Sequence, residues 1–157
     1  RWSRAGWRIT IGSRDAERAA RMADTLGAGA DASVAGADYV GAAAAAEVIV
    51  VAVPFASQAD VLASIRPVTA GKIVIDTTVP LMPPKVMRVQ LPAEGSAAVR
   101  AQRLLGDEVT VVSAFHNVAA HRLAADASVD CDVLVFGAKR EARQVAGDLA
   151  TAAGLRG

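Results

Sequence analysis

Short runs of β-branched residues, each bounded by turn residues, are the feature that most constrains how this chain folds. The clearest three are "EVIVVAVP" (47–54), "GKIVIDTTVP" (71–80) and "EVTVVSAF" (108–115). A continuous apolar run of this length predicts a strand that is buried on both faces. Strands of that kind occur almost only in parallel sheets that are covered by helices on both sides.

Alanine-rich amphipathic stretches lie between these runs. Helices are expected at 15–26, 38–46, 57–65, 95–105 and 139–153, and further strands at 8–11, 32–36 and 131–137. Two adjacent prolines, Pro83 and Pro84, predict a loop. The alternation of strands and helices predicts right-handed crossovers. The expected fold is therefore α/β, a doubly wound parallel sheet in a single domain that spans residues 1–157.

Composition excludes several classes of partner. The formal net charge is only +1, so no broad field attracts nucleic acid or an anionic membrane. The longest apolar stretch, residues 41–55, is interrupted by Glu47 and Pro54 and is too short to span a bilayer. The single cysteine, Cys131, rules out an internal disulfide, and no signal peptide is visible. We therefore expect a cytoplasmic protein.

The ends of the predicted strands are where a ligand site is expected. In open parallel sheets, ligands bind beyond the carboxyl ends of the strands. Residues with suitable chemistry follow four of the runs: Gly12-Ser13-Arg14, Pro54-Phe55, Thr77 to Pro80, and Ala114 to Asn117.

The first of these strand ends suggests a phosphate site. It carries no acid for a ribose 2′-hydroxyl but delivers Ser13 and Arg14, and Arg18 follows one helical turn later on the same face. A hydroxyl, two guanidinium groups and a helix N-terminus suit the 2′-phosphate of NADP rather than NAD. A serine N-cap followed by solvated charges explains the same residues equally well, and Asp15 would repel a phosphate unless it points away. Both interpretations stay open on these residues alone.

The other strand ends are less specific. Phe55 either lies against a nicotinamide ring or packs in the core, and Thr77 and Thr78 either bind a ligand or complete a loop. His116 follows a strand but has no partners spaced for a triad, and two histidines with one cysteine do not make a metal site. We therefore assign no catalytic residue and no metal ligand, and Cys131 is expected to be a small buried side chain.

One element of a dinucleotide site is absent from the sequence. No G-x-G-x-x-G turn lies between a first strand and a first helix. The chain opens directly in helix-like sequence, "RWSRAGWR", and closes just after a helix pattern. The expectation is a fragment of a longer chain whose first βα unit is not included.

Several motifs, taken in order, resemble one family. "IGSRDAERA", "AVPF", "KIVIDTTVPL", "LPAEGSAAVRAQRLLGDEVTVVSAFHNVAAHRL" and "CDVLVFG" together resemble the NADPH-dependent coenzyme F420 reductases, also called F420:NADP oxidoreductases. The block over residues 91–123 is the most specific. The resemblance implies a Rossmann-type domain that binds NADP(H) and coenzyme F420 and moves a hydride between nicotinamide C4 and deazaflavin C5.

Carried over by motif, the resemblance also implies cofactor contacts at Ser13, Arg14, Arg18, Phe55, Ala59, Val79 and Ala120. The family usually has lysine at position 18, often tryptophan at 55, and often proline at 119, where this chain has alanine. The role of His116, which matches a histidine of the same family block, stays open, with a proton relay as one hypothesis.

Three functions therefore remain in competition. The first is hydride transfer between NADP(H) and coenzyme F420, which needs proximity and exclusion of water more than an acid or a nucleophile. The second is an NADP-dependent reductase acting on a flavin or on a small carbonyl or imine. The third is a truncated, non-catalytic nucleotide-binding domain. The resemblance implies small-molecule cofactors as partners, with a homodimer as a further expectation.

Overall fold

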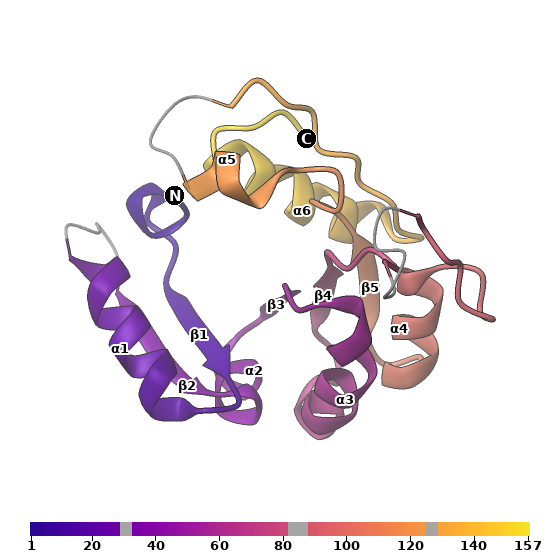
Figure 1. The fold of residues 1–157 in the computed structure, drawn as a ribbon, viewed down its shortest axis with the longest axis horizontal. Helices are drawn as coiled ribbons and strands as arrows, with labels where there is room; N and C mark the ends of the chain where they lie inside the picture. Colours follow the sequence, from indigo (N-terminus) through magenta and orange to yellow (C-terminus); the bar gives the residue numbers. More distant parts are fainter. Residues whose placement is uncertain (29–32, 82–87, 125–128) are drawn as a thin grey trace.

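The computed structural model describes residues 1–28, 33–81, 88–124 and 129–157 (Figure 1). Strands and helices alternate along the chain, with two short 3₁₀ turns. In order they are η1 (Ser3–Ala5), β1 (Ile9–Ser13), α1 (Ala16–Gly27), β2 (Val34–Asp38), α2 (Tyr39–Ala45), β3 (Val48–Val51), α3 (Phe55–Ile65), η2 (Arg66–Val68), β4 (Ile73–Asp76), α4 (Ala97–Leu105), β5 (Thr110–Ser113), α5 (Ala120–Ala124) and α6 (Arg140–Ala152). None of these helices is long and apolar enough to cross a membrane. The loop predicted at Pro83 and Pro84 lies outside the described residues.

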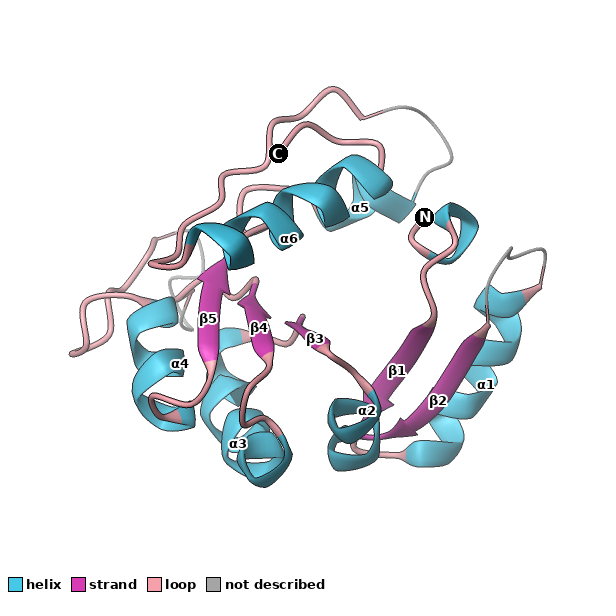
Figure 2. Cartoon of the chain, turned by 180° about the vertical axis from the view of Figure 1, so that it is seen from behind, coloured by secondary structure: helices cyan, strands magenta, loops and turns pink. Residues whose placement is uncertain are grey.

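All pairings between these strands are parallel, which confirms the predicted fold class, but the strands form two sheets instead of one. β1 pairs with β2, and β3, β4 and β5 form the second sheet in that order (Figure 2). α2 follows β2 and leads directly into β3, so it joins the two sheets. Within the described part of the chain, no strand lies between β1 and β3.

The second sheet has helices on both faces. Val48 and Val50 of β3 point toward a core cluster that includes α6, whereas Ile49 and Val51 point toward a cluster built from α3 and α4. This arrangement confirms a strand packed on two faces. Val48, Ile49 and Val50 are nevertheless only half-buried, which corrects the expectation of full burial. The reason is that, among the described residues, no strand neighbours the edge of β3 that lies toward β1.

The first sheet packs closely against α1 through one glycine. A Cβ on Gly36 of β2 would lie 2.3 Å from the carbonyl carbon of Ala19 and from the amide nitrogen of Ala20. Only glycine permits this approach of strand and helix backbones. Neither of the two core clusters includes a residue of β1 or β2, so this unit is held mainly by its own contacts and by α2.

A lysine from the second sheet binds the end of α2. The Lys72 Nζ donates hydrogen bonds to the carbonyl oxygens of Ala43 at 2.7 Å and Ala44 at 2.9 Å. These carbonyls belong to the last turn of the helix, where a cation is favourable. The contact fixes α2 against the start of β4.

The strand predicted at 131–137 is wrong. The Asn117 side chain forms hydrogen bonds with the backbone of this segment. Its Nδ2 donates to the Asp132 carbonyl at 2.8 Å, and its Oδ1 accepts from the Leu134 N–H at 3.2 Å. Only Phe136 pairs with β5, in an antiparallel bridge to Ser113. A side chain thus competes with the ladder for the hydrogen bonds of this segment.

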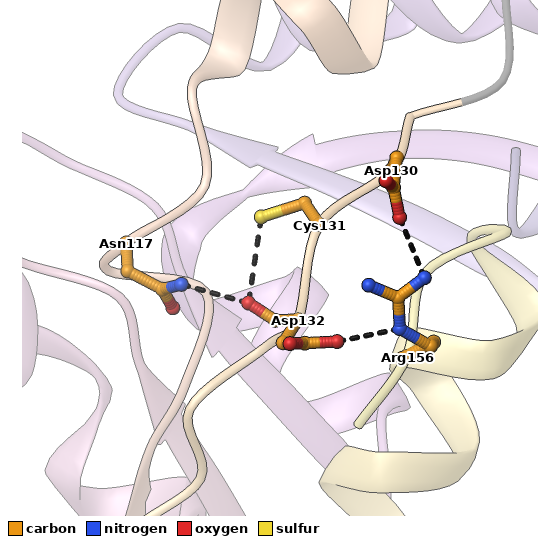
Figure 3. Close-up of polar contacts among 5 residues, drawn as sticks. All are labelled: Asn117, Asp130, Cys131, Asp132 and Arg156. Carbon is orange, nitrogen blue, oxygen red and sulfur yellow. Dashed lines mark hydrogen bonds and ion pairs between the residues drawn. The ribbon is translucent and has the colours of Figure 1, made fainter.

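The C-terminal residues are tied to the same segment by ion pairs. The Arg156 guanidinium lies 2.6 Å from carboxylate oxygens of both Asp130 and Asp132 (Figure 3). Between these acids, Cys131 is half-buried and its thiol donates to the Asp132 carbonyl at 3.4 Å. The expectation of a buried Cys131 is met only in part: the side chain packs against the core cluster but stays half-buried, because its segment does not form an inner strand.

Candidate functional site

The carboxyl ends of the strands define one edge of each sheet. In the second sheet, Val51, Asp76 and Ser113 are the aligned last residues of β3, β4 and β5. In the first sheet, Ser13 of β1 is aligned with Asp38 of β2. Ser13 and the segments that follow these strand ends carry the side chains predicted to bind a cofactor.

Two arginines at the end of β1 have no ion-pair partner among the described residues. The helix cap is Asp15, whose Oδ1 accepts from the Arg18 N–H at 3.0 Å, so the alternative of a serine N-cap is wrong. The Ser13 hydroxyl oxygen accepts from the Asp15 N–H at 3.3 Å and keeps its own hydrogen for donation. Arg14 and Arg18 are exposed, and among the described residues no acid pairs with either guanidinium.

Both acids at this edge, Asp15 and Asp38, accept hydrogen bonds from backbone N–H groups at helix N-termini. Asp15 caps α1, and the Asp38 Oδ1 accepts from the Gly41 N–H at 2.6 Å and so caps α2. Capping stabilises the carboxylate close to the positive end of the helix. The charge left for a ligand therefore comes from Arg14 and Arg18. Together with the Ser13 hydroxyl, these groups fit an added phosphate.

Phe55 begins α3 directly after the turn that follows β3. Its ring is buried, and the Arg100 guanidinium carbon lies 4.9 Å from the ring centroid, in the geometry of a cation–π contact. One helical turn further on, Ala59 is half-buried. The packing of Phe55 within the protein does not test whether it also contacts a cofactor, and that contact stays a prediction.

The end of β4 holds a buried polar network. The Gln58 amide nitrogen lies 3.0 Å from the Asp76 carboxylate, 2.9 Å from the Thr78 hydroxyl and 3.1 Å from the Ala97 carbonyl. Thr78 also donates to Asp76 through its N–H and its hydroxyl, both at 3.2 Å. These bonds fix the backbone just before Val79, which is half-buried.

Asp76 is almost fully buried, and its charge is costly. Burial raises the pKa of the Asp76 carboxyl above its usual value, while hydrogen bonds from Thr78 and Gln58 and the charge of His116 act in the opposite direction. Neighbouring Thr77 binds back to β3, because its hydroxyl and its N–H donate to the Val51 carbonyl at 3.0 and 3.2 Å. Thr77 and Thr78 therefore satisfy internal groups of the loop.

The end of β5 has an unusual backbone. Phe115 adopts a φ of 62°, in the left-handed region that a bulky residue seldom enters. Its ring meets Trp2 edge-on at 5.7 Å between centroids. His116 follows, with its Nδ1 3.4 Å from the Ser113 hydroxyl and its ring 5.8 Å from that of Phe136. Ala120 is exposed at the start of α5.

Of the seven predicted residues, Ser13 is the last residue of β1 and the other six lie on segments that follow a strand. The sequence analysis did not identify two further residues near these strand ends. Gln58 and Arg100 support the ends of β4 and β3, but neither follows an apolar run in the sequence. The one sequence signal for this polar network was Asp76, a carboxylate directly after a β-branched run. In the described part of the chain, no group of three or more His, Cys, Asp or Glu side chains is arranged to hold a metal ion.

The architecture defines the class as a doubly wound α/β fold of the Rossmann type. A hypothetical protein from Sinorhizobium meliloti superposes with a TM-score of 0.81 at 24% identity, over 99% of this chain and 74% of that one. A putative F420-dependent NADP-reductase from an Arthrobacter species superposes with a TM-score of 0.74 at 24% identity, over 92% of this chain and 69% of that one. A pyrroline-5-carboxylate reductase from Coxiella burnetii superposes with a TM-score of 0.61 at 16% identity, over 94% of this chain and 47% of that one.

Sequence comparison specifies the family. The family model described as "NADP oxidoreductase coenzyme F420-dependent" matches residues 1–80. An F420-dependent NADP reductase from Methanothermobacter thermautotrophicus is 42% identical over 96% of this chain and 68% of its own length. An F420-dependent NADP reductase from Methanocaldococcus jannaschii is 36% identical over 91% of this chain and 68% of its own length. The chain belongs to the coenzyme F420-dependent NADP oxidoreductase family, which confirms the resemblance seen in its motifs.

Proposed function

We propose that this chain transfers a hydride between NADP(H) and coenzyme F420. The observation that carries the proposal is its 42% identity, over 96% of its length, to a protein named F420-dependent NADP reductase. In the direction of F420 reduction, NADPH supplies a hydride from nicotinamide C4 and deazaflavin C5 accepts it, a ring nitrogen of the deazaflavin takes up one proton from solvent, and NADP⁺ is left. We further propose that the protein acts in the cytoplasm, as a homodimer.

The role of the β1 end is to select NADP over NAD. Ser13 donates its free hydroxyl hydrogen, and Arg14 and Arg18 supply two cations, at the N-terminus of α1. NAD carries no 2′-phosphate for these groups to bind. Because Asp15 and Asp38 already accept from helix amides, a bound phosphate meets carboxylates whose charge is partly compensated.

The ends of β3, β4 and β5 are proposed to receive the nicotinamide half. Ala59, Val79 and Ala120 are small apolar residues, which leave room for a ring and exclude water from it. Phe55, braced by Arg100, forms a rigid wall at the start of α3. Hydride transfer between two bound rings requires positioning and dryness, so this site needs no catalytic acid or nucleophile.

The phosphate assignment is tested by Arg14→Ala. Loss of one charge-assisted contact costs about 1.5–3 kcal/mol, which weakens NADPH binding by about 10- to 150-fold. The affinity for NADH stays nearly unchanged, because NADH has no phosphate at this position. Titration of cofactor fluorescence with both nucleotides measures the two constants.

The matched control is Arg103→Ala, which removes an exposed arginine in the last turn of α4, a helix that carries none of the seven predicted cofactor contacts. This variant should bind both nucleotides as the original chain does. Equal losses for NADPH and NADH in Arg14→Ala would contradict the assignment of the 2′-phosphate.

The hydride acceptor is tested by mixing the protein with NADPH and coenzyme F420 and following the absorbance of the deazaflavin. Parallel reactions contain FMN or a small cyclic imine instead. Reduction of F420 supports the proposal, whereas reduction of FMN or the imine alone identifies a different reductase. Binding of NADPH with no acceptor reduced indicates a nucleotide-binding domain without this activity.

A further inference from the structure

Arg100 places a positive charge against one wall of the proposed nicotinamide site. Its guanidinium carbon lies 4.9 Å from the centroid of the Phe55 ring, at the start of α3. The ring is buried, yet Phe55 belongs to neither of the two core clusters. The contact between Arg100 and Phe55 is therefore separate from the packing that covers the two faces of the second sheet.

The first turns of α3 and α4 hold this contact in place. Gln58 lies one helical turn after Phe55, and its amide nitrogen donates to the carbonyl of Ala97 in α4 at 3.1 Å. Arg100 follows one turn after Ala97. Both helices pack on the same face of the second sheet (Figure 1). The guanidinium is therefore positioned by two helices that are joined to each other where they begin.

No acid forms an ion pair with Arg100 in the part of the chain that the structure describes. α3 itself begins after Pro54 and has no Asp or Glu in its first turn. The buried carboxylate of Asp76 is bound by neutral donors, Gln58 and Thr78. Because Arg100 is also half-buried, its charge is screened less by water and salt than that of an exposed side chain.

The two redox states of the cofactor differ in charge at the ring that this site is proposed to hold. The nicotinamide ring of NADP⁺ carries one positive charge, whereas that of NADPH is neutral. The 2′-phosphate, the diphosphate and the adenosine are the same in both. A nearby cation therefore opposes the binding of NADP⁺ and has little effect on NADPH.

We propose that Arg100 determines which redox state the site prefers, because its charge weakens the binding of NADP⁺ relative to NADPH. The inference rests on the proposed binding of the nicotinamide beside Phe55. A ring stacked on Phe55 lies about 4.5 Å from its centroid, which puts the two positive charges about 9 Å apart. With an effective dielectric constant between about 20 and 60, their repulsion changes the ratio of the two dissociation constants about 3- to 20-fold.

The same charge favours one direction of the reaction. A tenfold preference for NADPH raises the midpoint potential of the bound NADP⁺/NADPH couple by about 30 mV. Hydride transfer from C5 of the reduced deazaflavin to nicotinamide C4 of NADP⁺ then becomes more favourable. It yields NADPH and the oxidised coenzyme, and a deazaflavin ring nitrogen releases one proton to solvent. Arg100 therefore favours the formation of NADPH in the site.

The test compares the dissociation constants of NADP⁺ and NADPH for the unmodified chain and for Arg100→Met, by isothermal titration calorimetry. Methionine keeps an unbranched apolar side chain against Phe55 without the charge. The ratio of the constant for NADP⁺ to that for NADPH should fall about 3- to 20-fold, mainly because NADP⁺ binds more tightly. Arg100→Gln, a second uncharged variant, should show the same change even where the methionine variant does not fold. Arg100→Lys should keep the original ratio.

Two controls isolate the charge of the nicotinamide. Arg103→Met removes the same charge from an exposed position one turn further along α4, where solvent screens it, and should leave the ratio nearly unchanged. The second control is 2′-phospho-ADP-ribose, which carries the phosphates of the cofactor but no nicotinamide. Its affinity should be the same for the unmodified chain and for Arg100→Met.

Three outcomes would overturn the proposal. An unchanged ratio in both uncharged variants means that the charge does not act on the nicotinamide, and leaves the proposed hydride transfer standing. Equal weakening of NADP⁺, NADPH and 2′-phospho-ADP-ribose in these variants means that Arg100 binds a phosphate instead. Failure of the unmodified chain to bind either nucleotide refutes the proposed function and this inference with it.

Discussion

Replacing Gln58 with leucine tests how the buried charge of Asp76 is maintained. The Gln58 amide shares its hydrogens among the Asp76 carboxylate, the Thr78 hydroxyl and the Ala97 carbonyl, at 2.9 to 3.1 Å. A lost hydrogen bond to a buried carboxylate costs about 1.5–3 kcal/mol. Leucine also removes the Gln58 Oε1, a buried acceptor with no hydrogen-bond partner in the described part of the chain, which offsets part of that cost. We expect a net loss of about 2 kcal/mol near neutral pH.

The loss should depend on pH because Asp76 titrates. Its pKa in the folded state is raised above 3.8, so its contribution to stability is complete below that value and is lost as pH rises through the folded-state pKa. Without Gln58, the folded-state pKa of Asp76 rises further. The difference in unfolding free energy between the two proteins should therefore grow, from about 1 kcal/mol or less at about pH 4 to about 2 kcal/mol at about pH 7.5.

Gln102→Leu is the matched control. Gln102 donates to the Gly106 and Val109 carbonyls at 2.8 and 2.9 Å and accepts from the Val111 N–H at 3.2 Å, with no carboxylate among these partners. Its replacement should cost a similar amount at every pH. Urea unfolding followed by circular dichroism gives the free energies. The same pH-independent loss in both variants would refute the account of Asp76.

Two further predictions concern backbone packing and capping. Gly36→Ala should destabilise the protein by about 2 kcal/mol or more, because its Cβ meets the α1 backbone at 2.3 Å, whereas Gly147→Ala in α6, with open space around its Cβ, should stabilise it by about 0.5–1 kcal/mol; thermal unfolding of both variants checks the two signs. Ser96→Ala removes the oxygen that accepts from the Val99 N–H at 3.1 Å at the start of α4 and should cost about 1 kcal/mol, whereas Ser96→Asp, which keeps an acceptor, should retain most of the stability.

The strands were predictable because hydrophobicity marks the buried run, but their ends were not. The run over 47–54 continues past Val51, where β3 ends, since Ala52 and Val53 no longer have a partner on β4. Pairing, which depends on a distant strand, sets the boundary. The same reason explains 131–137, where Asn117 binds the backbone that the pattern assigned to a strand.

The candidate site was predictable where it depends on position along the chain. Ser13 and Arg14 come directly after a predicted strand, so the fold rule alone selects them. Gln58 was not predictable, because a glutamine in an alanine-rich helix gives no sign of burial. It is buried only because α3 places it beside Asp76, and that contact joins residues 18 positions apart. The division of the sheet into two was likewise invisible, since local patterns do not specify which strands are neighbours.

The unit formed by β1, α1 and β2, which carries Arg14 and Arg18, has little interior of its own. Among the described residues from 9 to 38, only Ala19 and Ala23 are buried, and both are small. Such a unit opens at a lower free-energy cost than the larger sheet beside it. A ligand that binds only the closed arrangement shifts that balance by mass action. Under the proposed binding of NADP(H) at the end of β1, cofactor concentration therefore sets not only turnover but also how long β1, α1 and β2 survive proteolysis.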